Sequence, residues 1–154
     1  MLEGWCLLDA DRPAEAAGAF AALAAQPGKA GEEAAYGLAL ARLRTGEPAR
    51  ASEAAAALGA DRRKEIDAAV LAQQASAAFD RGDYAATLDS LDRRSRLVTP
   101  SRDLEVLGAW ALLKAGRTRE SMALFGRLDR EQSTRDTRIG FAEASKLTYM
   151  PRER

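Results

Sequence analysis

Residues 108–128, GAWALLKAGRTRESMALFGRL, are nearly repeated at residues 3–23, EGWCLLDADRPAEAAGAFAAL. The two copies are offset by 105 residues, which is three lengths of 35. A fixed period of this size indicates a protein built from stacked copies of one small helical motif. The offset pairs Trp5 with Trp110, Phe20 with Phe125 and Leu23 with Leu128.

Two weaker copies lie between these, and a short polar turn aligns all four. The turn positions are Asp11, Gly46, Gly82 and Gly116, which are separated by 35, 36 and 34 residues. The residue three before each turn is apolar. The residue five after it is small: Ala16, Ala51, Thr87 and Ser121. Because these two positions flank the turn, they predict two closely packed helices joined as a hairpin. Twelve residues after the turn stand Leu23, Leu58, Arg94 and Leu128, so the third repeat departs from the pattern there.

Proline, glycine and capping residues divide the sequence into nine expected helices. Their ranges are 2–10, 13–26, 31–45, 49–58, 61–81, 84–98, 101–115, 118–130 and 134–147. We expect side chains to cap five of these helices at their first turn. The expected caps are Asp61, Asp83, Ser101, Thr118 and either Ser133 or Thr134.

These helices predict one all-α domain over residues 1–154. Its repeats are expected at about 1–30, 31–60, 61–100 and 101–132, with a trailing helix at 134–149. The first helix is about one turn short of its counterpart, and the trailing helix has no predicted partner after it. We therefore expect the chain to be a fragment of a longer protein. The alternative is that the trailing helix is the lone cap that such stacks require.

The pattern resembles the tetratricopeptide repeat (TPR) family, and the resemblance covers nearly the whole chain. The best match runs from Leu71 to Pro100, with Gly82-Asp83-Tyr84 as the turn and Pro100 as the closing proline. Asp11 replaces the turn glycine of the first repeat, and prolines replace the turn tyrosine of the first two. The resemblance implies a right-handed α-solenoid of about four hairpins plus a C-terminal helix. It also implies that a peptide or helix of another protein binds the concave face.

In this family the first helices of successive hairpins line the concave face. Aromatic and charged side chains at the matching positions suit such a partner, since aromatic anchors dominate binding energies. The equally open alternative is that Trp5 and Trp110 only fill gaps between repeats. A clamp of lysines and asparagines is not expected, because the chain has no asparagine. The predicted partner-binding residues are Trp5, Asp9, Tyr36, Leu40, Arg44, Ser76, Asp80, Val106, Trp110 and Lys114.

The sequence offers no chemistry for catalysis, and we expect no catalytic residue, cofactor or metal site. It contains no histidine, the commonest general base and metal ligand, and no glycine-rich phosphate loop. Its single cysteine, Cys6, is expected to be a small buried residue. The 23 basic and 23 acidic side chains balance, which argues against a nucleic-acid partner. No apolar run approaches about 20 residues, so this segment is not expected to insert into a membrane.

Two basic clusters, Arg62-Arg63-Lys64 and Arg93-Arg94-Ser95-Arg96, are candidate sites for an anionic partner. The simpler interpretation is that both are solvated ends of helices.

Two further functions remain open. The alanine- and arginine-rich texture loosely resembles the periplasmic TPR scaffolds of bacterial exopolysaccharide and cellulose export proteins. A self-association module, forming a homo-oligomer through its end repeats, is the other. The sequence leaves the compartment open between bacterial cytoplasm and periplasm. Because alanine fills the inner side of the second repeat, we expect that repeat to be the least stable.

Overall fold

The described part of the chain is all-helical, as predicted. The computed structural model describes residues 1–150, and within that range there are nine α-helices and no strand. They are α1 Leu2–Asp9, α2 Pro13–Ala24, α3 Lys29–Arg44, α4 Pro48–Ala55, α5 Ala60–Asp80, α6 Tyr84–Ser95, α7 Arg102–Lys114, α8 Thr118–Glu131 and α9 Arg135–Tyr149. The chain divides into two compact units, an N-terminal unit of Met1–Gln73 and a C-terminal unit that begins at Gln74.

The four aligned turn positions share one backbone conformation. Asp11, Gly46, Gly82 and Gly116 have φ angles of 54°, 75°, 76° and 81°. At Gly116 the N–H donates to the carbonyl three residues earlier, Leu113, at 3.1 Å, and the next N–H donates to the carbonyl of Leu112 at 2.9 Å. The same pair of bonds closes α1, α3 and α5. This is the Schellman motif at the C-terminus of a helix. Its left-handed position favours glycine, because glycine has no Cβ to clash with the backbone.

The residue after each turn position is the N-cap of the next helix. These N-caps are Arg12, Glu47, Asp83 and Arg117. The prediction that Thr118 caps α8 was therefore wrong, because Arg117 is the N-cap and Thr118 is the first residue of the helix. Asp61 was also wrong as a cap, since α5 already begins at Ala60 and Asp61 lies in its first turn.

Two predicted caps are confirmed. The Asp83 side chain accepts from the N–H of Ala86 at 3.0 Å. Thr134 forms a capping box with Thr137 at the start of α9, which settles the choice between Ser133 and Thr134. Ser101 does occupy the N-cap position of α7, but its side chain makes no capping hydrogen bond.

The small position five residues after each turn is fully buried in all four hairpins. Ala16, Ala51, Thr87 and Ser121 each have 0% exposure. In the last hairpin the Ser121 hydroxyl donates to the carbonyl of Ala109 at 2.8 Å, across from α8 to α7. Small side chains here let the two helices of a hairpin approach closely, as the spacing predicted.

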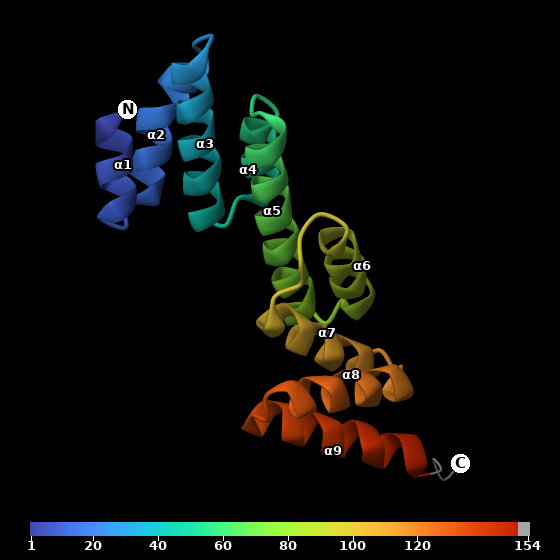
Figure 1. The fold of residues 1–154 in the computed structure, drawn as a ribbon. Helices are drawn as coiled ribbons and strands as arrows, with labels where there is room; N and C mark the ends of the chain where they lie inside the picture. The colour runs from blue at the N-terminus through green and yellow to red at the C-terminus, as the bar shows by residue number, and fades with distance from the viewer. Residues whose placement is uncertain (151–154) are drawn as a thin grey trace. The chain divides into compact units, whose positions relative to one another are not determined.

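In the N-terminal unit α1, α2 and α3 pack side by side (Figure 1). The ring of Phe20 on α2 is fully buried among these helices, with Leu8 and several alanines. A second cluster joins α3, α4 and the first part of α5, and most of its buried residues are alanines, together with Leu58, Ile66 and Val70.

In the C-terminal unit α7, α8 and α9 pack together, and α6 packs against α7 (Figure 1). Phe125 and Leu128 of α8 are fully buried there, with 0% exposure each. This core uses larger side chains than that of the α3–α4 hairpin.

Candidate functional site

The two tryptophans have matching surroundings in the two units. The rings of Trp5 and Phe20 meet edge to face with centroids 5.0 Å apart and planes at 69°. Those of Trp110 and Phe125 meet at 5.0 Å and 74°. Both phenylalanines are fully buried, whereas both indoles are only half-buried. Each tryptophan therefore packs on the core and also presents part of its ring to the surface.

In the N-terminal unit the exposed side of Trp5 is extended by a second aromatic ring. The centroid of Tyr36, on α3, lies 6.3 Å from that of Trp5. Charged side chains from α5 hold this ring in place. The Tyr36 hydroxyl donates to Glu65 Oε1 at 2.8 Å, and the guanidinium of Arg62 lies 4.8 Å from the ring centroid. Aromatic rings flanked by charges of both signs form a surface suited to a polar, partly apolar ligand.

The same contacts affect the ionisation of Tyr36. Partial burial raises the pKa of the Tyr36 phenol, and its hydrogen bond to the Glu65 carboxylate raises that pKa further. Arg62 is itself held by Glu33, with Nη2 and Oε1 2.7 Å apart. The phenol therefore stays protonated and continues to donate at neutral pH.

Arg44 has a structural role in addition to its predicted one. Its Nη1 donates to the carbonyl of Leu8 at 2.6 Å, near the C-terminus of α1. A cation at this end of a helix stabilises the exposed carbonyls. Leu40 is half-buried and packs against both core clusters of this unit, and Asp9 is exposed. Within this unit the structure thus brings Trp5 together with Tyr36, and Arg44 with the end of α1.

In the C-terminal unit the predicted residues of α7 lie at successive turns of one helix face. Val106 and Trp110 are half-buried, and Lys114 is exposed. The indole Nε1 of Trp110 donates to Asp136 Oδ1 of α9 at 3.2 Å, which fixes the ring. Ser76 and Asp80 are exposed and lie one turn apart on α5.

Sequence reasoning missed the polar partners of the aromatic rings. Arg62 was noticed only as part of a basic cluster, and Glu65 and Asp136 were not singled out. A signal was present, because Tyr36 and Glu65 are 29 residues apart and Trp110 and Asp136 are 26 apart, in each case slightly less than one repeat. Residues separated in this way lie on alternate helices, α3 and α5 or α7 and α9, and are shifted by about two turns from the repeat spacing.

Cys6 was expected to be buried, and this was wrong because it is exposed. It follows Trp5 on α1, and one residue along a helix rotates the side chain by about 100°, away from the packed face.

Within residues 1–150 no three acidic, histidine or cysteine side chains gather as a metal-binding group, and no helix there is both long and apolar enough to cross a bilayer. No family model, curated protein or solved structure matches the sequence.

Proposed function

We propose that this chain is a non-catalytic interaction scaffold. In this proposal its hairpins form a right-handed TPR-like α-solenoid, and its concave face binds a peptide or helix of another protein. The observation that carries the proposal is the recurrence of a half-buried tryptophan on a buried phenylalanine, at the same repeat position in each unit.

The recurrence of the turn supports the solenoid. Four helix endings with the same pair of backbone hydrogen bonds recur at intervals of 34 to 36 residues. Repeated hairpins with identical connections can stack with a constant rotation between neighbours, which generates a superhelix with a concave face.

The chemistry of the aromatic surface supports a protein partner. Trp5 and Tyr36 offer apolar contact area, while Arg62 and Glu65 hold charges of both signs beside them. Tyrosine, tryptophan and arginine are the residue types that contribute most to binding at protein interfaces. The rings are held by neighbouring side chains, so little entropy is lost when a partner binds.

The test is a pull-down with the purified full chain. Asp9 and Lys114 suit charge reversal, because both are exposed and neither side chain makes an ion pair or hydrogen bond within residues 1–150. We expect Asp9→Lys with Lys114→Glu to lose a partner that the wild type retains. Arg119→Glu, an exposed change on α8, is the matched control and should retain that partner. Equal recovery of that partner by all three proteins would contradict binding through the concave face.

Self-association is a second candidate, favoured by apolar side chains exposed on α9. Ile139, Leu147 and Tyr149 have 44%, 50% and 74% of their surface exposed. Sedimentation at several concentrations, comparing wild type with Leu147→Glu, tests this function. A monomer at every concentration argues against it.

A further inference from the structure

The C-terminal unit contains a mostly apolar cavity between α6, α7 and α8. Its volume is about 200 Å³. Half of its ten lining residues are leucines: Leu88 and Leu91 from α6, Leu104 and Leu112 from α7, and Leu124 from α8. A cavity with such a wall favours an apolar ligand over water.

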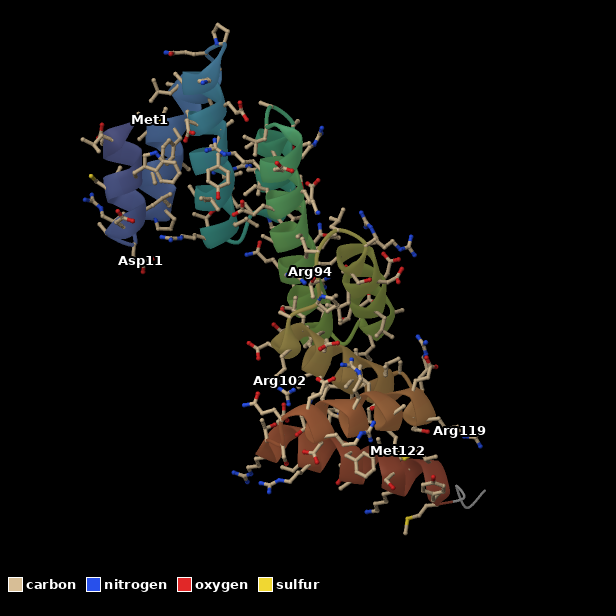
Figure 2. All side chains as sticks on the ribbon, in the orientation of Figure 1. Met1, Asp11, Arg94, Arg102, Arg119 and Met122 are labelled. Atoms are coloured by element: carbon tan, nitrogen blue, oxygen red, sulfur yellow. The ribbon has the colours of Figure 1, made fainter. Side chains whose placement is uncertain are left out.

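Arg94 lines this cavity. The residue, which is labelled in Figure 2, lies on α6 at the position where the third repeat departs from the pattern. The other repeats have leucine there, and two of those leucines lie in the core, with Leu58 7% and Leu128 0% exposed. Of the four aligned positions, only that of Arg94 is not leucine, and the cavity lies beside it.

The guanidinium of Arg94 lacks a protein acceptor at its buried nitrogen. Within residues 1–150, its Nε is buried and has no hydrogen-bond partner. Its basic neighbours are satisfied differently, because Arg93 pairs with Asp89 and Arg96 with Asp92, each four residues earlier. The residue four before Arg94 is Ser90, which has no charge to offer.

The acidic residue in the cavity wall does not fill this role. Glu105 accepts from Arg127 Nη2 at 2.6 Å, so its carboxylate already has a cationic partner on α8. The cavity thus combines an apolar wall with a cation whose buried donor is unused. Arg94 also forms no ion pair with another residue in the described range, so a ligand that joins a negative charge to an apolar chain would match both the guanidinium and the wall.

We propose that this cavity binds a medium-chain aliphatic carboxylic acid, with its carboxylate on Arg94 and its alkyl chain among the leucines. Guanidinium and carboxylate are matched in shape and charge. A free acid fits better than a peptide, because Ser95 is the only lining residue besides Arg94 and Glu105 with a polar side chain, which leaves peptide amides few partners. The cavity is below the range of about 300–1,000 Å³ typical of larger ligands, which favours a chain of moderate length.

Calorimetric titration of the full chain with octanoate tests the proposal, and octan-1-ol is the uncharged control ligand. We expect saturable binding of octanoate, weaker by about tenfold or more for octanol and for the Arg94→Leu protein, since the charged hydrogen bond is lost. Arg93→Leu removes a neighbouring charge that does not line the cavity and should bind octanoate as the wild type does.

Arg94→Leu restores the leucine of the other repeats, so the variant is expected to fold, and circular dichroism checks this. Arg94→Gln, a polar replacement, provides a second variant that should also lose octanoate. The proposal is overturned if octanoate does not bind, if octanol binds equally well, or if both Arg94 variants bind octanoate unchanged. Tighter binding of a leucine-terminated peptide than of octanoate would also overturn it. None of these results depends on the partner of the concave face.

Discussion

Phe20 occupies the space that a side chain on Gly37 would need: a Cβ built on Gly37 would lie 2.5 Å from Cζ of Phe20. On its other side the same ring lies against Gly4, whose Cβ would lie 2.6 Å away. Phe125 and Gly140 repeat this relationship in the C-terminal unit. A large ring at this repeat position thus requires a helix without a side chain opposite it.

Replacing Gly37 by alanine should therefore destabilise the fold, because Phe20 is held from both sides and cannot retreat. We expect Gly37→Ala to lower the free energy of unfolding by about 1–3 kcal/mol, the usual cost of overpacking. Gly18→Ala is the control, since Gly18 is an exposed helical residue with nothing within 4 Å of its Cβ position. That change should instead stabilise the protein by up to about 1 kcal/mol. Urea unfolding measures both, and a Gly37→Ala protein as stable as wild type would contradict the packing.

The turn residues provide a second prediction. Gly116 has a φ of 81°, a conformation that disfavours any residue with a Cβ, so Gly116→Ala should cost about 1 kcal/mol of stability. Asp11 adopts a similar conformation without being glycine, so Asp11→Gly should cost nothing comparable, since glycine removes strain while adding freedom to the unfolded chain. The midpoint temperatures of thermal unfolding of the two variants test this prediction. The prediction fails if Asp11→Gly is the more damaging of the two.

The Asp129 carboxylate makes stability depend on pH. Its pKa is held below the usual 3.8 by hydrogen bonds, first from the Thr137 hydroxyl and then from that of Ser133. Because the pKa is lowered in the folded state, this group stabilises the fold above its unfolded-state pKa. That contribution disappears as the pH falls through the folded-state pKa.

An NMR titration of the carboxyl carbon should give Asp129 an inflection below pH 3.8. Ser133→Ala removes the second hydrogen bond, of 2.8 Å, and should move the inflection part of the way back. Ser95→Ala, an exposed serine that bonds only to a backbone carbonyl, should leave it unchanged. An unshifted Asp129 would show that these hydroxyls do not act on the carboxylate.

The α3–α4 hairpin should be the first to open. Helix α4 has eight residues, and its buried side chains are the alanines Ala51 and Ala55. Helix α8 has 14 residues and buries Phe125 and Leu128, which contribute far more apolar area. We expect amide hydrogens of α4 to exchange faster than those of α8 by more than about tenfold. Slower exchange in α4 would refute this order of stability.

The repeat period predicted the features that depend on local geometry. The turn positions, the buried small residues and the Asp83 cap all follow from residue type and spacing along one hairpin. Thr118 was misplaced by one residue, because the backbone of the turn, and not the best capping side chain, decides where the helix starts.

Contacts between hairpins could not be predicted in the same way. The spacing indicates which helices neighbour one another, but it does not indicate that Arg62 reaches both Glu33 and the ring of Tyr36, because that depends on the offset between the helices and on the conformation of the arginine side chain. Arg94 was visible as a departure from leucine, but only coordinates reveal that its Nε is buried without an acceptor.

The four Schellman endings turn the chain in the same way, whichever side chains surround them. Two backbone bonds reverse the path, while the side chains beside them vary: Arg12 pairs with Glu15 and Arg117 with Glu120, but Glu47 pairs with Arg50 in the opposite sense. A connector that tolerates either sign of charge can be duplicated along a gene without constraining what its neighbours become. Each copy is then free to acquire its own specificity, one helix at a time.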